Sequence, residues 1–191
     1  YVFTPTTGNA INVAVAGVGD ISLSAGTYSA DVAALETASG TEVISGAGNI
    51  ALTKLEDDLN ADLSVVTTTG TKTVAVSDAK GIVAFIGNLG SGFTTSVGTG
   101  STLSTTATIL DGQTISGAGS VSVSGNLSND LGVDLSGITV TGSGGVITAT
   151  ESAGGTFTTG ADLGTTQLTI GTAITAITQA NPASVTATNH G

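Results

Sequence analysis

The sequence Ile44-Ser45-Gly46-Ala47-Gly48 returns letter for letter as Ile115-Ser116-Gly117-Ala118-Gly119, at an offset of 115 − 44 = 71 positions. A second block, Asp58-Leu59-Asn60-Ala61-Asp62-Leu63-Ser64, returns as Asp130-Leu131-Gly132-Val133-Asp134-Leu135-Ser136, at an offset of 134 − 62 = 72 positions. One inserted residue between the blocks reconciles the two offsets. Two ordered blocks at nearly the same offset indicate a duplicated unit, and stacked units build elongated proteins. The duplication predicts a fibre, lattice or stalk rather than a compact enzyme.

The composition predicts an all-β chain with a thin core. Of the 191 residues, 39% are hydrophobic and 29 are Gly, whereas Trp, Met and Cys are absent and only four Phe and two Tyr occur. β-Branched Val, Ile and Thr suit the pleated surface of strands, and Gly, Asn and Asp supply turns. A core with so few bulky side chains has to be narrow. The absence of Cys excludes disulfides and thiolate metal sites.

Short alternating runs of apolar and polar residues predict strands with one buried face. Strands of this length with tight turns and a small-aliphatic core favour a β-solenoid, parallel β-helix-like and built from repeats of about 71 residues. The alternative is a tandem pair of small antiparallel β-sandwiches, one per repeat, which the scarcity of aromatic residues disfavours. The predicted strands are Ile11 to Ala16, Asp20 to Ala25, Asn49 to Thr53, Lys72 to Ser77, Ser120 to Ser124, Ile138 to Thr141 and Val146 to Thr150.

Two segments have the residue types of helices. Ala30 to Ala38 follows Ser29, a residue type that caps helices, so it predicts a short helix. Leu55 to Leu63 is the second candidate, but its repeat counterpart contains Gly132, which disfavours a helix. We expect both copies of this second segment to be extended or turn-like.

The repeats divide the chain into four expected segments. Residues 1–78 hold the first repeat unit with N-terminal strands, and residues 113–172 hold the second unit. Residues 79–112 form a β-rich connecting segment, either further solenoid strands or a boundary between units. Residues 173–191 are expected to be the truncated start of a following β module.

The charge balance is strongly acidic, with 14 Asp and Glu against three Lys and Arg and a formal net charge of −11. Contacts with phosphates require Lys and Arg, so nucleic-acid binding is excluded. An anionic membrane surface would repel the chain, and no run approaches the roughly 18 apolar residues of a membrane-spanning helix. We therefore expect no membrane insertion. Charge of one sign does, however, attract divalent cations.

Catalytic chemistry is not expected. His190 is the single histidine, and no Cys or second His accompanies it to form a metal site or a catalytic triad. The many Ser and Thr hydroxyls lack a neighbouring base in the sequence that would activate them. We expect a protein that is not an enzyme and has no certain cofactor.

Calcium is the one ligand that the sequence favours. Acidic residues gather in the second repeated block and supply the hard oxygen ligands that this ion prefers. The sequence nevertheless favours a simpler role for these residues over calcium binding, namely that they cap turns and solvate an edge of the fold. The candidate calcium ligands are Asp57, Asp58, Asp62, Asp130 and Asp134.

Two parts of the chain resemble known families. The paired blocks, over residues 41–150, resemble the units of large repetitive bacterial surface-layer and adhesin-like β-solenoid proteins. The stretch from Ile174 to Gly191 is similar to the opening of a small β-rich module of phage tail and other virion proteins. Neither resemblance implies catalytic residues.

Together these features predict a structural, non-catalytic segment of a large extracellular assembly at a cell surface or in a virion, such as a surface layer, adhesin or fibre. It would act by self-association with identical copies or neighbouring repeats, with calcium between them. The alternative is a phage tail fibre or tailspike component that binds carbohydrate on a host surface. In that case cell-surface glycans would be its partners.

Overall fold

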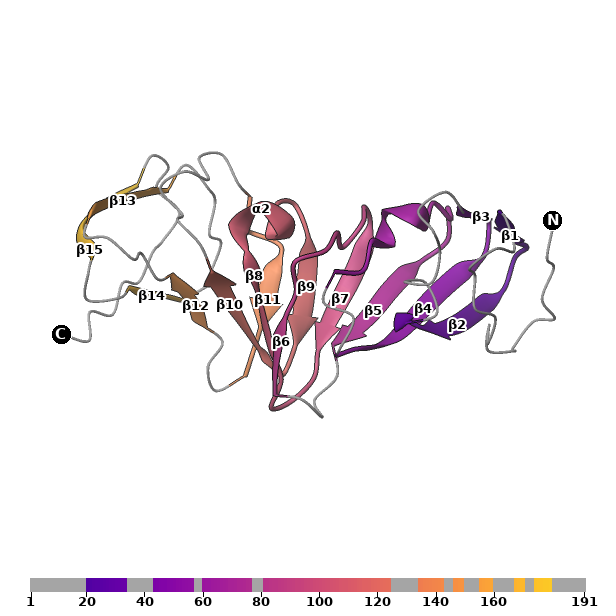
Figure 1. Ribbon diagram of the computed structural model, residues 1–191, viewed down its shortest axis with the longest axis horizontal. Helices are drawn as coiled ribbons and strands as arrows, with labels where there is room; N and C mark the ends of the chain where they lie inside the picture. The colour runs from indigo at the N-terminus through magenta and orange to yellow at the C-terminus, as the bar shows by residue number, and fades with distance from the viewer. Residues whose placement is uncertain are drawn as a thin grey trace.

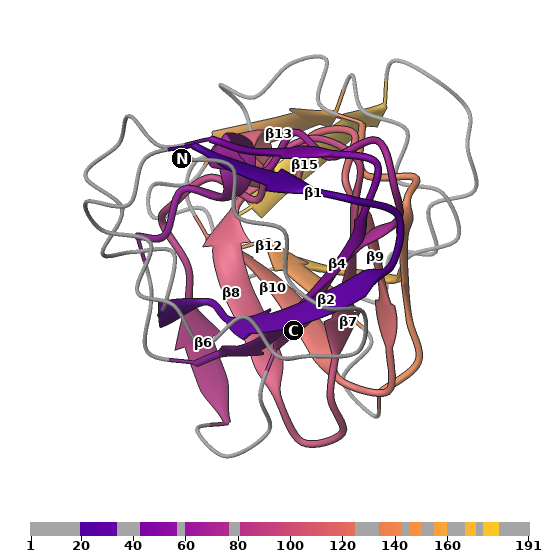
Figure 2. The same cartoon turned by 90° about the vertical axis from the view of Figure 1, so that its right-hand side faces the viewer.

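The chain forms an all-β solenoid, which the computed structural model describes over residues 20–33, 43–56, 60–76, 81–124 and 134–142 and, as backbone, in four later strands. All the strand pairs in this part of the chain are parallel, as expected when each coil stacks on the one before it. Figure 1 shows the coils following one another along the long axis, and Figure 2 shows the strands surrounding a common interior. The predicted β-solenoid is confirmed, and the alternative of tandem antiparallel sandwiches is wrong.

The widest of three faces, here called the long sheet, holds six strands in the order β11-β9-β7-β5-β4-β2. Partner residues in its neighbouring strands lie 20 to 23 positions apart along the chain, as in Thr94 with Thr114 (114 − 94) and Ile115 with Ile138 (138 − 115). This spacing is the length of one coil, measured on this face. The strands are β2 (Thr27–Asp31), β4 (Asn49–Leu55), β5 (Lys72–Val76), β7 (Phe93–Val97), β9 (Thr114–Gly117) and β11 (Ile138–Val140).

The other two faces are the second sheet, in the order β14-β12-β10-β8-β6, and a third face. On the third face β1 pairs with β3, and β13 pairs with β15 on the same side of the molecule at the C-terminal end (Figures 1 and 2). Between those pairs the third face has isolated bridges, the 3-10 helix η1 (Leu63–Val65) and the four-residue helix α2 (Ala107–Leu110). The strands are β6 (Ile82–Ala84), β8 (Thr102–Thr106), β10 (Ser120–Ser124), β12 (Val146–Ala149) and β14 (Gln167–Ile170), with β1 (Ile21–Leu23), β3 (Ile44–Gly46), β13 (Gly155–Thr159) and β15 (Ile174–Gln179).

The core is narrow and mostly aliphatic, as the composition predicts. Inward side chains of successive coils stack in register, so each buried residue contacts its counterpart in the coils on either side. Thr95 is an exception, since it is fully buried and its hydroxyl has no hydrogen-bond partner. The column that contains it runs through Ala30, Leu52, Val74, Thr95, Ile115 and Ile138.

The duplicated Ile-Ser-Gly-Ala-Gly sequence forms a corner between two faces. Its first glycine has a positive φ in both copies, 103° at Gly46 and 118° at Gly117. A Cβ there would overlap the carbonyl oxygen of a residue in the preceding coil, Leu23 for the first copy and Val97 for the second. The same carbonyl accepts a hydrogen bond from the backbone N of the last glycine of the motif, at 3.2 Å and 3.0 Å. Only glycine allows the chain to turn so close to the coil below.

The coil that follows each corner covers it with a pair of threonines, Thr67 and Thr69 over the first copy and Thr139 and Thr141 over the second. The second threonine of each pair donates its backbone N–H to the carbonyl of the positive-φ glycine, at 2.9 Å and 2.8 Å. All four hydroxyls donate to corner-strand carbonyls at 3.3 to 3.4 Å. The two copies therefore make the same contacts between coils.

The copies nevertheless occupy different faces of the solenoid. β3, which holds the first copy, lies on the third face, whereas β9, which holds the second, lies in the long sheet. The offset between the copies exceeds three coils without reaching a whole fourth, so the unit that stacks is the coil rather than the sequence repeat. Residues 79–112 contribute β6, β7 and β8 to the ladder, and β7 pairs with both β5 and β9. The expected division into four segments stays a prediction.

Six of the seven predicted strands are confirmed as β1, β4, β5, β10, β11 and β12, and the run from Ile11 to Ala16 lies outside the described residues. The helix predicted from Ala30 is wrong at its start, because Ala30 lies in β2 and pairs with Leu52. Sheet pairing overrides the helical preference of alanine there. No helix in the described ranges is long and apolar enough to cross a membrane.

Replacing the corner glycine should be far more damaging than replacing a glycine with the same type of backbone in open space. We expect Gly117→Ala to destabilise the solenoid by more than about 2 kcal/mol, through backbone strain and overlap with the preceding coil. Gly100→Ala is the matched control, because φ is 83° there and a Cβ added to it would meet no atom within 4 Å. It should cost about 1 kcal/mol. Equal losses of melting temperature in the two variants would contradict this account of the corner.

Removing the unpaired hydroxyl of Thr95 should stabilise the fold. Valine has nearly the same shape, and Val74 and Ile115 on either side are aliphatic. We expect Thr95→Val to raise the free energy of unfolding by about 1 kcal/mol, which thermal or urea denaturation would detect. Thr94→Val, on the exposed side of the same strand, is the control and should have little effect. A lower melting temperature for Thr95→Val would mean that the hydroxyl is satisfied in solution.

Candidate functional site

Asp62 and Asp134, the acidic residues of the repeated block that the structure describes, each cap a turn. Asp62 Oδ1 accepts hydrogen bonds from the backbone N of Ser64 at 3.0 Å and from its hydroxyl at 2.6 Å. Asp134 Oδ1 accepts one from the backbone N of Ser136 at 2.9 Å. The leucine between Asp and Ser is buried in both copies and anchors the turn in the core. Asp-Leu-Ser thus builds the same capped turn twice.

These turns belong to a column of Asp and Asn residues on four successive coils. Asp62 and Asn88 are partners in an isolated parallel bridge. Asn88 Oδ1 accepts the backbone N–H of Gly90 at 2.9 Å, which repeats the turn of the coil before. Asp111 Oδ1 accepts the backbone N–H of Asp134 at 2.8 Å, so the column continues to the second copy.

The column does not bring the predicted calcium ligands together. Asp57, Asp58 and Asp130 lie outside the described residues. Asp62 and Asp134 are three coils apart, roughly 14 Å at the spacing of neighbouring strands, so they cannot ligate one ion. Among the residues that the structure describes, no group of three or more His, Cys, Asp or Glu could hold a metal. Both described aspartates cap turns, the alternative that the sequence left open, and calcium binding stays a prediction.

The turn at Asp134 should make stability depend on pH in the acid range. Hydrogen bonds from the Ser136 hydroxyl and then from its backbone N–H hold the pKa of Asp134 below its ordinary value of 3.8, against a smaller effect of burial. The unfolded chain therefore binds this proton more readily than the native one, so the contribution is complete above about pH 4 and is lost as the pH falls below that. We expect Asp134→Asn to reduce the loss of melting temperature between neutral pH and about pH 2.

Ser136→Ala tests the cause of that pH dependence, because it removes the hydroxyl and keeps the backbone donor. The pKa of Asp134, followed by NMR titration of its carboxyl carbon, should rise toward the ordinary value in this variant. An unchanged titration, or an Asp134→Asn variant as acid-sensitive as the parent chain, would show that the turn does not carry the effect.

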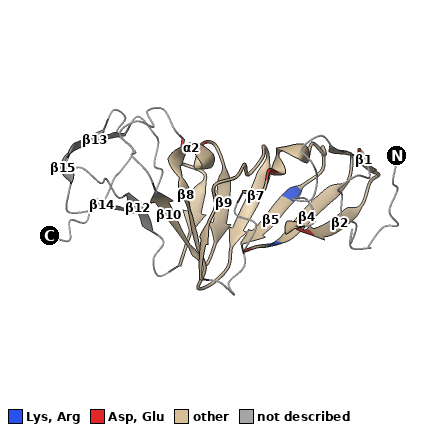
Figure 3. Ribbon diagram, in the orientation of Figure 1, with Lys and Arg blue, Asp and Glu red and all other residues tan. Residues whose placement is uncertain are grey.

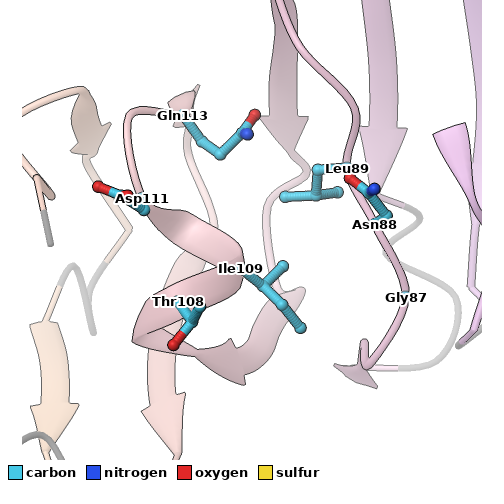
Figure 4. Close-up of a pocket in the computed structure, with 7 residues that line it drawn as sticks. All are labelled: Gly87, Asn88, Leu89, Thr108, Ile109, Asp111 and Gln113. Carbon is cyan, nitrogen blue, oxygen red and sulfur yellow. The ribbon is translucent and has the colours of Figure 1, made fainter. Parts of the chain in front are cut away.

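A polar slot opens where α2 replaces a strand on the third face (Figure 4). α2 lies on one side and residues 87–89 on the other, and between them the side chain of Leu89 is buried in the core and that of Ile109 packs against the core. The slot has a volume of about 380 Å³, and an adjoining cavity of about 390 Å³ shares Asn88, Asp111 and Gln113 with it. The slot is lined by Gly87, Asn88, Leu89, Thr108, Ile109, Asp111 and Gln113.

One wall of the slot is an unpaired strand edge. The backbone N and O of Asn88 bond to the preceding coil, at 3.0 Å to Ala61 O and 2.8 Å to Leu63 N. Successive residues of an extended chain direct these groups to opposite sides, so those of Gly87 and Leu89 face α2. Neither residue has a hydrogen bond on that side within the described part of the chain. Coils on the other two faces stay paired at this level, β5 with β7 and β6 with β8.

The outward side of the central strands of the long sheet, β5, β7 and β9, presents small, uncharged side chains, whereas Asp31 of β2 and Lys54 of β4 form an exposed ion pair at 3.3 Å toward one edge of the sheet. Its central strands present two columns in the register of the sheet, and Figure 3 shows how few charged residues the described ribbon carries. Lys72, at the start of β5, is turned to the carbonyl of Val66 at 3.4 Å and to the face of the Phe93 ring, 5.4 Å from its centroid. The columns are Thr73, Thr94 and Thr114, and Ala75, Ser96 and Ser116.

Comparison of the chain with known protein families, with curated proteins and with solved structures found no match. The chemistry of the chain therefore has to be judged from its own residues. The repeated Asp-Leu-Ser pointed to the capped turns, whereas the slot was not predicted from the sequence. Its signal is Ala107–Leu110, where an apolar run too short for a stable isolated helix follows the polar strand β8.

Proposed function

We propose that this chain is a structural, non-catalytic segment of a large extracellular assembly, such as a surface layer, adhesin or fibre, and that it acts by self-association. The observation that carries the proposal is the uncharged outward surface of the central strands β5, β7 and β9 of the long sheet, on a chain whose net charge is −11. Two copies that approach through acidic surfaces repel each other, whereas two copies that meet through β5, β7 and β9 bring no like charges together there. Their partner is therefore a second copy of the chain.

The solenoid supports this role through its shape and its surface. Stacked coils extend in one direction and place identical spacings of hydroxyl and methyl groups along the long sheet, so two copies can interdigitate in register. Divalent cations would lower the repulsion between the remaining acidic surfaces. Calcium acts in this proposal as a shared counterion, and the acidic residues of the repeated block are its contacts.

Calcium should shift the chain from monomers to larger species. We expect sedimentation velocity and light scattering to show assembly in millimolar calcium and its reversal by a chelator. Potassium chloride at matched ionic strength separates general screening from divalent binding, since screening alone would act equally in both salts. A chain that remains monomeric in millimolar calcium, with an unchanged melting temperature, would remove both the assembly and the calcium claims.

A pair of charge variants locates the contact. Thr94→Asp places a carboxylate in the middle of the long-sheet surface, and we expect it to weaken association by at least about tenfold. Ser104→Asp adds the same charge to the outward side of β8 in the second sheet, so it should leave association close to that of the parent chain. Equal weakening by both variants would mean that net charge, rather than this surface, controls assembly.

A further inference from the structure

We infer that Asp111-Gly112 is a site at which the chain modifies itself by forming isoaspartate, and that the next coil keeps this site unreactive. The inference goes beyond the structural role proposed above and does not depend on it. Asp111 is the only aspartate in the sequence that is followed by glycine. Glycine hinders this reaction least, because it has no side chain to shield its backbone nitrogen.

The turn after α2 requires this reactive pair. Asp111 has a φ of −55° and a ψ of 120°, and Gly112 has a φ of 64°. The backbone N of Gln113 donates to Leu110 O at 3.0 Å, which closes a type II turn over the pair. The third position of such a turn needs a positive φ, so another residue in place of Gly112 would be strained. The fold therefore keeps a glycine directly after Asp111.

The reaction links the two residues through the aspartate side chain. The Gly112 nitrogen attacks Cγ of the protonated Asp111 carboxyl, and a bond forms between these two atoms. The bond from Cγ to the hydroxyl oxygen breaks, and that oxygen leaves as water with the amide hydrogen. Solvent water then opens the cyclic imide. Where it breaks the bond between Gly112 N and the former backbone carbonyl carbon, the chain continues through Cγ as isoaspartate, and no other reactant is consumed.

One residue of the following coil holds both reacting groups. Asp134 donates its backbone N–H to Asp111 Oδ1 at 2.8 Å, and its backbone O accepts the N–H of Gly112 at 2.9 Å. Figure 4 shows the Asp111 carboxylate directed away from the slot. The ψ of 120° at Asp111 also turns the Gly112 nitrogen away from the aspartate side chain. The carboxyl group and the amide must both leave Asp134 and rotate toward each other before they can react.

Opening of this layer therefore becomes irreversible if it lasts. Asp111, Gly112 and Asp134 are all exposed, so water reaches the pair as soon as Asp134 moves away. The rate of the reaction follows the fraction of time that the layer is open. Isoaspartate adds a methylene carbon to the backbone and carries its carboxylate directly on Cα. The two hydrogen bonds to Asp134 then cannot both be restored.

Incubation of the full chain at neutral pH and physiological temperature tests the site. Isoaspartate at position 111 is measured by mass spectrometry after digestion with an endoproteinase that cleaves before aspartate but not before isoaspartate. We expect the chain unfolded in urea to convert at least about tenfold faster than the native chain. Asp62 and Asp134, each followed by leucine, are internal controls and should stay intact. Equal rates in the native and unfolded chains, or no isoaspartate at position 111 in the unfolded chain, would overturn the inference.

Two matched variants test whether Asp134 is the residue that protects the pair. Asp134→Ala removes the carboxylate that caps the turn of the second copy, so the native rate at Asp111 should rise by at least about threefold. Asp62→Ala removes the equivalent cap of the first copy and should leave that rate close to the parent value. In urea all three chains should convert at the same rate. Equal native rates in the two variants, at similar melting temperatures, would show that global unfolding rather than Asp134 controls the reaction.

Discussion

The stacking of this solenoid depends on the close approach of a corner glycine to a carbonyl of the coil beneath it. At Gly46 and Gly117 the chain turns with positive φ directly over Leu23 and Val97. The turn sets the height at which the next strand starts, and hence the register in which inward side chains stack. The aliphatic core can be thin because backbone contacts at the corners, rather than large side chains, fix the distance between coils.

The sequence repeat is not a whole number of coils long, so the same corner sequence occurs at two different corners of the solenoid. The same corner sequence serves between the third face and the long sheet in one copy and at the far side of the long sheet in the other. Corner geometry therefore does not depend on which faces it joins. A solenoid with interchangeable corners can gain or lose residues between them by small steps, since the spacing of partners in the long sheet already varies from 20 to 23 positions.

Much of the fold could be predicted because its signals are local. Alternation in Ser120–Ser124 gives both the strand and its buried valines. The preference for a solenoid over sandwiches followed from the few aromatic residues available to fill a core. The features of the fold that the sequence did not predict depend on contacts with neighbouring coils. Ala30 is extended because Leu52 pairs with it, and α2 forms in a layer where the two other faces hold the coil in place.

The candidate sites likewise divide into one that the local sequence reveals and one that depends on neighbouring coils. Asp62 and Asp134 were found through the repeat, and their role as turn caps follows from a serine two residues on. Two carboxylates far apart in sequence can share an ion only if few coils separate them. The repeat offset is not a whole number of coils, so it does not reveal how many coils lie between the two copies. The slot is an absence of pairing between two coils, and the short apolar run Ala107–Leu110 does not by itself show which groups of the neighbouring coil stay unpaired.

The helix α2 also has a mechanical consequence. Between the coil that holds residues 87–89 and the coil that holds α2, both within the described ranges, the ladders of β5 with β7 and β6 with β8 continue, but the third face contributes no strand pair. Tension along the axis must pass through two ladders there instead of three. A stretched rod of this kind yields at a layer with few bonds, so among the layers described on all three faces, the one between residues 87–89 and α2 would open under load and leave two blocks of coils.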